Sequence, residues 1–263
     1  MPLVPDWRLQ YSARPMSAST AETLAGPRRS DQFSQPAVLE EALSLLGPGR
    51  VAVFDLDSTL LDNRPRQVRI VRELGRTLGD ERLVACQAAY WTGWDLETPL
   101  ARCGLSPAEV SALADQAKTF WRERFFTSEY CQDDVPIAGA AGFLARVART
   151  GAVICYVTGR HVEMGFGTIQ SFERGGFLIP NEGRVRLLLK PAFPMSDDAW
   201  KREVAQRLPT FGRVACAFDN EPTHINGYRA DFPESLAVHL DTDHSGRPVP
   251  LLEGIPSIRD FVL

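Results

Sequence analysis

The stretch that most restricts the possible folds of this chain is an apolar run that ends in two carboxylates. Residues 51–54 read Val-Ala-Val-Phe, and Asp55, Asp57, Ser58 and Thr59 follow. An apolar run behind Gly and Pro residues is typical of a strand buried on both faces, as in a parallel sheet covered by helices. Ligands of such sheets bind beyond the carboxyl ends of the strands. Two carboxylates at that edge are costly to bury unless a cation or a substrate compensates them.

The rest of the chain alternates between strand-like and helix-like patterns. Further apolar runs predict strands at 152–157, 185–189, 214–218 and 235–240, and helical spacing predicts helices at 36–46, 141–148, 161–172 and 196–208. Strands that alternate with helices imply right-handed crossovers and a parallel sheet with helices on both faces. We therefore predict an α/β fold.

One region, residues 63–134, interrupts this alternation because it contains no strand-like run. Apolar residues at helical spacing predict helices at 68–78 and 83–91. Ser106-Pro107-Ala108-Glu109 has the form of a capping box with proline at the first helical position, and it precedes a long amphipathic pattern. We expect a small all-helical unit, inserted directly after the first strand into a core made of residues 36–62 and 135–263.

Composition limits the class of protein. The chain has 263 residues, a net charge of −4 and no basic stripe, so we expect no nucleic-acid partner. The five cysteines show no C-x-x-C spacing, which favours a reducing compartment. Without a membrane-length apolar run or a hydrophobic signal region, we expect a cytoplasmic protein with no membrane partner. Residues 1–35, rich in Pro, Ser, Ala and Arg, are expected to form a flexible arm.

Three more groups of polar residues follow predicted strands. Thr158-Gly159-Arg160 follows the second strand, Lys190 closes the third, and Asp219-Asn220-Glu221 follows the fourth. A hydroxyl and a free N–H at a strand end can bind an oxyanion, although a threonine there is also a common helix cap. A lysine that closes an apolar strand can hold its ammonium over a phosphate, or it can be solvated. Lys201 is the second candidate for such a lysine.

These residues resemble the motifs of the haloacid dehalogenase (HAD) superfamily. Asp55-Leu56-Asp57-Ser58-Thr59 is similar to the first motif in its phosphatase form, Asp-x-Asp-x-Thr, and Thr158, Lys190 and Asp219 resemble the second, third and fourth motifs in order. The helical insertion falls where the type-1 cap of this superfamily lies. The resemblance implies a Rossmann-like core with a helical cap, and a Mg²⁺-dependent phosphatase that acts through an aspartyl-phosphate.

The resemblance also implies a role for each motif residue. Asp55 would be the nucleophile and Asp57 the general acid and base. Mg²⁺ would be held by the side chains of Asp55 and Asp219 and the backbone carbonyl of Asp57. The phosphoryl group would be bound by Thr158, Lys190 and the amides of Leu56 and Gly159. The sequence departs from the family at the position after Asp219, where a second aspartate is often found. Asn220 is our first choice to complete the metal site and Glu221 our second.

Several alternatives remain open from the sequence. An acid at position 57 argues against dehalogenation, and the expected substrate is a small phosphorylated metabolite. The same motifs also serve phosphotransferases and phosphomutases, and Asn220 motivates a third possibility, a catalytically silent scaffold used for binding. Most aromatic residues of the insertion are expected in its own core (Trp91, Phe120, Trp121, Tyr130), whereas Trp94 lies beside Gly93, off the clearest helical pattern, and is the candidate to contact substrate. Arg160 and His161 either face the substrate or lie at the surface. The oligomeric state stays open.

Overall fold

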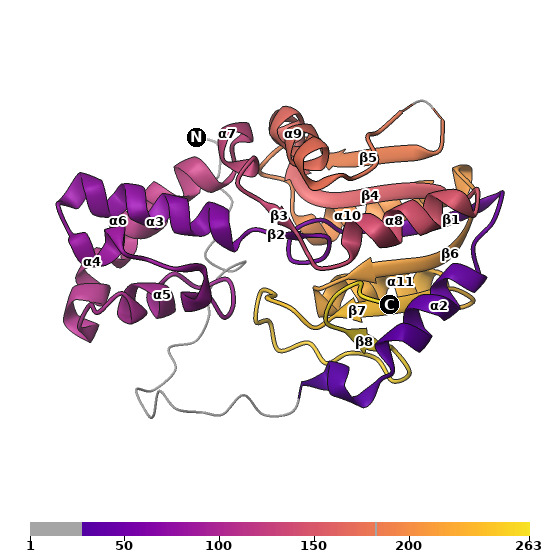
Figure 1. Cartoon of the computed structure of the whole chain (residues 1–263), viewed down its shortest axis with the longest axis horizontal. Coiled ribbons are helices and arrows are strands. Elements are labelled where there is room, and N and C mark those ends of the chain that lie inside the picture. Colours follow the sequence, from indigo (N-terminus) through magenta and orange to yellow (C-terminus); the bar gives the residue numbers. More distant parts are fainter. Residues whose placement is uncertain (1–27, 182) are drawn as a thin grey trace.

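The computed structural model describes residues 28–181 and 183–263. Figure 1 shows two parts, an α/β core and a helical lobe beside it. Most of the predicted flexible arm, residues 1–27, lies outside the described residues. In the described part of the chain, every helix is too short or too polar to cross a membrane.

The core is built on one parallel sheet. Its six strands have the order β5-β4-β1-β6-β7-β8, and they are β1 (Arg50–Phe54), β4 (Val153–His161), β5 (Val185–Lys190), β6 (Arg213–Asp219), β7 (Leu236–Leu240) and β8 (Ser257–Ile258). Each neighbouring pair is parallel, which confirms the predicted α/β fold. Because β1 lies between β4 and β6, the residues after these three strands share one edge of the sheet. The two-residue strand β8 was not predicted, since it is too short to show a pattern.

Helices cover both faces of the sheet. They are α2 (Gln35–Ser44), α8 (Ala140–Arg149), α9 (Gly165–Gly175), α10 (Asp197–Arg207) and α11 (Pro222–Asp231). Strand β1 contributes to two apolar clusters. Ala52 and Phe54 pack with α2, α8 and α9, while Val51 and Val53 pack with α10 and α11. Alternate residues of a strand point to opposite faces, so β1 is buried on both sides, as its continuous apolar run predicted.

A cluster of phenylalanines fixes the strand ends that lead into the candidate site. The rings of Phe54 and Phe218 stack with centroids 5.0 Å apart, and Phe143 and Phe261 pack around them. Buried aromatic pairs contribute about 0.5–1.5 kcal/mol beyond their area. Asp55 and Asp219 follow Phe54 and Phe218 directly, so this cluster helps to fix the backbone positions from which the two carboxylates extend.

The helical lobe lies between β2 (Leu61–Asp62) and β3 (Val135–Pro136), an antiparallel pair through which the chain leaves and re-enters the core. It contains α3 (Arg64–Leu78), α4 (Glu81–Val84), η2 (Ala88–Tyr90), α5 (Glu97–Arg102), α6 (Pro107–Phe125) and α7 (Ser128–Cys131). The lobe has its own apolar cluster, which includes Leu83, Trp91 and Leu100. The predicted capping box is present: Ser106 Oγ accepts from the Glu109 N–H, and Glu109 accepts from the Ser106 N–H.

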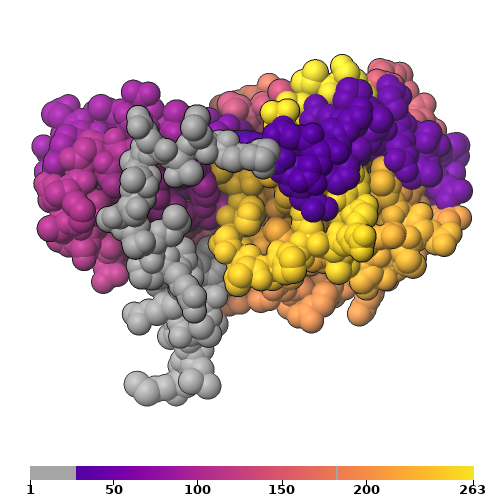
Figure 2. All heavy atoms as spheres, turned by 90° about the horizontal axis from the view of Figure 1, so that it is seen from below, coloured from indigo at the N-terminus to yellow at the C-terminus, as the bar shows by residue number. Residues whose placement is uncertain are grey.

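Residues 28–35 differ from the flexible arm expected for this segment. They form η1 (Arg29–Gln32) and the start of α2, next to the C-terminal segment (Figure 2, indigo beside yellow). Arg29 donates to Ser257 Oγ and the Ile255 carbonyl at 3.0 and 2.8 Å, and Gln35 Nε2 donates to Asp260 at 2.6 Å. These partners lie more than 220 residues away, so composition near the N-terminus could not indicate them.

Candidate active site

A tight turn after β1 carries the two carboxylates of the first motif. The N–H groups of Thr59, Leu60 and Leu61 all donate to the Leu56 carbonyl at 2.8–3.1 Å. Ser58 has a φ of 59°, which is uncommon for a residue with a Cβ. The Thr242 hydroxyl donates to the Ser58 carbonyl and helps to hold this turn. Backbone strain of this kind clusters at functional sites.

Lys201, on α10, joins the carboxylates that end β1 and β6. Its Nζ donates to Asp55 Oδ1 at 2.6 Å, to Asp219 Oδ2 at 2.8 Å and to the Val157 carbonyl at 2.9 Å. All three side chains are buried. Burial lowers the pKa of Lys201, but Asp219 and Asp55 more than offset this, so its pKa lies well above the usual value. Lys201 is therefore charged, and two carboxylates share one ammonium.

Lys190, which was predicted to bind the phosphoryl group, does not reach these carboxylates. Its Nζ donates to Asp197 Oδ1 at 2.6 Å, and it lies 5.8 Å from the centre of the Phe193 ring. The reason is the sheet order: β5 is the edge strand, separated from β1 by β4. Lys201, the second candidate from the sequence, takes the position beside Asp55 because α10 packs across β4.

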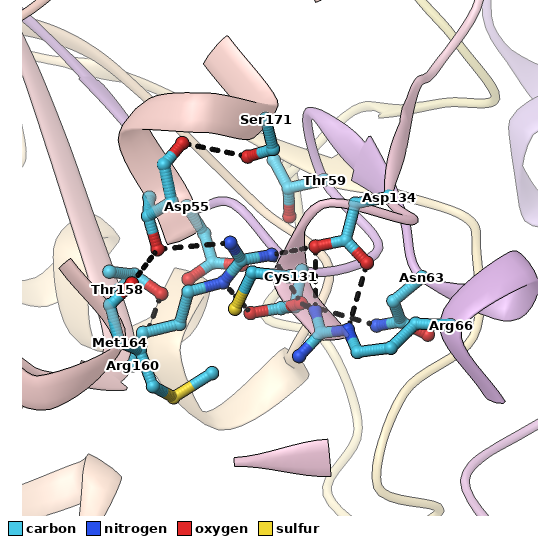
Figure 3. A network of polar contacts seen from close by, with 12 residues as sticks. Asp55, Thr59, Asn63, Arg66, Cys131, Asp134, Thr158, Arg160, Met164 and Ser171 are labelled. Carbon is cyan, nitrogen blue, oxygen red and sulfur yellow. Dashed lines mark hydrogen bonds and ion pairs between the residues drawn. The ribbon is translucent and has the colours of Figure 1, made fainter. Parts of the chain in front are cut away.

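Asp57 belongs to a buried network of four charges. Its two oxygens accept from Arg160 Nε and Nη2, both at 2.8 Å, and Oδ1 also accepts from Arg66 Nη2 at 2.7 Å. Both arginines also donate to Asp134, at 2.5–2.8 Å. Figure 3 shows Arg66 and Arg160 on either side of Asp134. Burial raises the pKa of Asp57, but Arg160 and Arg66 outweigh it and hold that pKa below its usual value.

The second-motif residues that were predicted to bind an oxyanion, Thr158 and Gly159, lie within β4. Thr158 is buried and its Oγ1 accepts from the Arg160 N–H at 3.2 Å. A Cβ added to Gly159 would come within 2.7 Å of the Asp197 carboxylate, so this position has no room for a side chain unless Asp197 moves. Arg160 is buried and lies beside Asp57. Of the two positions left open by the sequence, facing the site or lying at the surface, it takes the first. His161 is also buried, and it packs against Phe193.

The residues after Asp219 are bonded to the surrounding loops. Asn220 Oδ1 accepts from the Thr59 hydroxyl at 3.1 Å, and its Nδ2 donates to the Asp243 carbonyl at 2.6 Å. Glu221 accepts from the N–H and hydroxyl of Ser245. Each side chain therefore has a partner in the surrounding loops.

His224, on α11, is a site residue that the sequence did not indicate. Its Nε2 lies 2.9 Å from Asp198 and its Nδ1 lies 3.6 Å from Asp219 Oδ1. Burial lowers the pKa of His224, but Asp219 and Asp198 together outweigh burial and raise it to about 9. A charged His224 adds positive potential beside Asp219.

A cavity of about 110 Å³ brings the predicted residues together. Its walls include Asp55, Asp57, Thr158, Gly159, Lys201, Asp219, Asn220 and Glu221. On the side of the helical lobe, the wall consists of Trp94, Phe125 and Phe126, joined by Met164 of the core. The cavity therefore has a charged floor and an apolar roof. Lys190, and Leu56 whose amide was also predicted to bind the phosphoryl group, are not among its wall residues.

The oxygen donors suit a hard divalent cation. Among residues 28–181 and 183–263, no group of three or more His, Cys, Asp or Glu side chains forms a metal site. Asp55 and Asp219 share Lys201, and in the described part of the chain nothing donates a hydrogen bond to Asp55 Oδ2. Mg²⁺ binds through one or two carboxylates, keeps several waters and uses substrate phosphate oxygens as ligands. Asp55 and Asp219 provide carboxylate oxygens of this kind at the wall of the cavity.

Lys201 and Arg160 were only secondary candidates in the sequence analysis, although the pattern around each of them indicated that its side chain points inward. Lys201 falls on the same helical face as Val204, Ala205 and Leu208, which are all buried, so its periodicity indicated an inward side chain. Arg160 is two residues after Thr158 in a strand and therefore shares its face. Arg66 and Asp134 gave no signal, because they meet only when the two ends of the helical lobe come together.

Known structures share this fold, although sequences do not. Neither protein-family models nor the sequences of curated proteins match this chain. Protein tyrosine kinase A from Mycobacterium tuberculosis is 15% identical with a TM-score of 0.50, over 81% of this chain and 94% of its own. A haloacid dehalogenase-like hydrolase from Streptococcus pneumoniae is 12% identical with a TM-score of 0.42, over 75% and 85%. A class C acid phosphatase from Bacillus anthracis, with tungstate bound, is 14% identical with a TM-score of 0.43, over 82% and 79%.

At sequence identities this low, similarity to a known structure shows a shared fold and nothing further. The parallel sheet, the helical insertion after β1, and the polar residues at the ends of β1 and β6 and within β4 are the features of this fold. The chain has the fold of the HAD superfamily, as its motifs predicted.

Proposed function

We propose that this protein hydrolyses phosphate monoesters through a covalent aspartyl-phosphate on Asp55, with Mg²⁺ as cofactor. The observation that carries the proposal is the meeting of Asp55, Thr158, Lys201 and Asp219 around one cavity, from four separate segments of the chain. Such a set provides a nucleophile, donors for an oxyanion and oxygens for a cation. The acid at position 57, which dehalogenases of this fold lack, favours phosphoryl chemistry.

Asp55 acts as the nucleophile. One carboxylate oxygen forms a bond to phosphorus while the bond between phosphorus and the ester oxygen breaks, and the alcohol departs. Water then attacks phosphorus, inorganic phosphate is released, and the Asp55 carboxylate is restored. The tight turn and the Phe54–Phe218 stack hold Asp55 in a fixed position, which reduces the entropic cost of reaching the attacking geometry.

Positive groups stabilise the transferring phosphoryl group. In this proposal Lys201 takes the role first assigned to Lys190, and the Thr158 hydroxyl and the amides of Leu56 and Gly159 add hydrogen bonds. Mg²⁺ bound by Asp55, Asp219 and the Asp57 carbonyl would neutralise the repulsion between carboxylate and phosphate. Asn220 acts here through its bonds to Thr59 and Asp243, which position the loop after β6.

Asp57 is the group placed to move protons between the leaving oxygen, the attacking water and the protein. Its Oδ1 is held by Arg66 from the helical lobe and by Arg160 from the core. A proton transfer through Oδ1 therefore needs one of these contacts to lengthen. Arg66 is the partner from the helical lobe, so this contact joins the lobe to the group that transfers protons.

The test is phosphate release from a panel of phosphate esters, with and without Mg²⁺. We expect Mg²⁺-dependent turnover by the natural chain, and a loss of at least about 10³-fold in Asp55→Asn, because the nucleophile is gone. Asp62→Asn is the matched control, since Asp62 is paired with Arg64 outside the cavity, and it should retain activity. Turnover by Asp55→Asn would refute the nucleophile. Transfer of the phosphoryl group to an added sugar, without phosphate release, would favour a phosphotransferase.

A further inference from the structure

The roof of the cavity is aromatic while its floor is charged. Trp94, Phe125 and Phe126 of the helical lobe face the same cavity as Asp55 and Lys201. A phosphoryl group bound on the floor has its leaving oxygen directed away from Asp55, because attack and departure are in line. The leaving part of a substrate therefore extends toward these rings.

The roof is rigid. The rings of Trp121 and Phe125 stack with centroids 4.4 Å apart, and Trp94 meets Phe125 edge to face at 5.5 Å. Phe126 packs at 4.8 Å against Phe193, which belongs to the core loop after β5. This continuous set of rings joins the helical lobe to the core. Rigid aromatic side chains lose little entropy when they bind a ligand.

A hydrogen bond positions Trp94, and Asn220 of the fourth motif bonds to the same acceptor. Its Nε1 donates to the Asp243 carbonyl at 3.2 Å, and the same carbonyl accepts from Asn220 Nδ2. Trp94 lies between η2 and α5 and is only partly buried. It does not belong to the apolar core of the lobe around Trp91 and Leu100. It packs instead against the second apolar cluster of the lobe, formed by Ile70, Phe125 and Tyr130, and its bond to the Asp243 carbonyl ties this cluster to the core.

The charges nearby select among ligands that aromatic rings can bind. Rings often bind cations such as quaternary ammonium groups. Here the Arg66 guanidinium already lies 4.1 Å from the centre of the Phe125 ring, and Arg160 is close to it through shared contacts with Asp57 and Asp134. Both guanidinium groups are paired with Asp57 and Asp134, so only a cation placed on the Phe125 ring itself, beside Arg66, would meet a like charge. A neutral ring meets no such repulsion.

We propose that the alcohol part of the substrate is a single neutral aromatic ring, and that Trp94 and Phe126 recognise it. This inference rests on the proposed function, since it names the ester that the site hydrolyses. The cavity of about 110 Å³ limits the size of the group, because an apolar cavity of about 150 Å³ holds one benzene molecule. Because about 110 Å³ is less than this, a phosphoryl group bound in the cavity leaves the ring at its mouth, beside Trp94 and Phe126. A fused ring system or a nucleoside would extend further out of the cavity, beyond these two rings.

The test compares two esters that differ only in the ring. Benzyl and cyclohexylmethyl phosphate both release a primary alcohol, so intrinsic leaving ability is nearly matched. We expect kcat/KM to favour benzyl phosphate by about 2- to 12-fold, the range of one or two aromatic contacts. Trp94→Leu and Phe126→Leu should remove this preference. Trp94→Phe should keep most of it, and Phe120→Leu is the control, since Phe120 is a ring of the lobe that is not part of the cavity wall.

Binding of two phosphonates that cannot be hydrolysed separates this inference from the proposed function. Benzylphosphonate should bind more tightly than cyclohexylmethylphosphonate, by the same factor, in titration calorimetry. Equal binding and equal turnover would overturn the ring assignment, as would a preference for phosphocholine over benzyl phosphate. A ring preference in binding without phosphate release from any ester would uphold the assignment and overturn the proposed function.

Discussion

The two lysines near the site differ in how deeply their ion pairs are buried, and this difference sets how much each pair contributes to stability. Lys201 is almost fully buried and serves two carboxylates. Lys190 serves Asp197, which is 28% exposed. A buried pair is costly to break because the partner stays buried and charged, whereas a partly exposed pair is screened by water.

We expect Lys201→Met to lower the free energy of unfolding by about 3–5 kcal/mol and to abolish turnover, because Asp55 and Asp219 lose their shared cation. Lys190→Met should cost about 1 kcal/mol or less and leave turnover within an order of magnitude. Urea unfolding and phosphate release measure both effects. Equal losses in the two variants would contradict the assignment of Lys201 to the site.

His224 makes stability depend on pH. Its pKa is raised to about 9 in the folded chain, against about 6.5 when unfolded. The stabilisation is complete below pH 6.5 and is lost as pH rises through 9. In metal-free protein, the natural chain should lose roughly 1–3 kcal/mol of unfolding free energy across this window relative to His224→Gln. Urea unfolding at several pH values measures this, and parallel pH profiles of the two proteins would refute it.

At the level of single residues, the sequence predicted the strand-end groups and missed those that depend on packing between elements. Asp55, Thr158 and Asp219 were predictable because each directly follows its own apolar run in the sequence. Lys190 was misplaced because the sequence does not reveal that β5 is the edge strand. His224 lies in α11, whose sequence, with a Gly and several polar residues, shows no clear amphipathic pattern.

Among the elements, the two crossings between core and lobe are the most tightly bonded. Arg66, in the first turn of α3, and Asp134, just before β3, form a buried pair at 2.8 Å. The crossings themselves pair as β2 and β3. This arrangement fixes where the helical lobe begins and ends relative to Asp57.

A double-mutant cycle tests whether Arg66 and Asp134 form one unit. Arg66→Met and Asp134→Asn should each cost about 3–5 kcal/mol of unfolding free energy, since each leaves a buried charge without its partner. The double variant should cost less than the two combined, by about 0.5–3 kcal/mol. Arg64 and Asp62 form the control pair, because Arg64 is 42% exposed, and their coupling should be at most about 1 kcal/mol. Additive losses at Arg66 and Asp134 would contradict a shared role.

Element boundaries were predictable where a local signal marks them. The capping box at Ser106 gave the start of α6 correctly. The helix expected from His161 begins instead at Gly165, because β4 continues to His161. The helix expected at 83–91 is divided into α4 and η2. In the last two cases the tertiary contacts outweigh the local pattern.

At the scale of the whole molecule, the fold follows from the alternation of apolar strands and helices. The sequence predicted the parallel sheet and the helical insertion, and hence the edge where the site lies. It did not predict the contact of residues 28–35 with the C-terminal segment, which joins the two ends of the described chain across β8. Contacts of that range have no signature in local composition.

The most direct test of the central claim, that these segments form one phosphoryl-transfer site with Asp55 as nucleophile, is to trap the covalent intermediate. The protein is mixed with Mg²⁺ and with benzyl phosphate that carries the radiolabel on phosphorus. The reaction is then quenched rapidly in acid. We expect label on the peptide that contains Asp55, its release by hydroxylamine as for an acyl phosphate, and no label in Asp55→Asn. Label on another residue, or turnover without any labelled protein at the shortest quench times, would contradict the account.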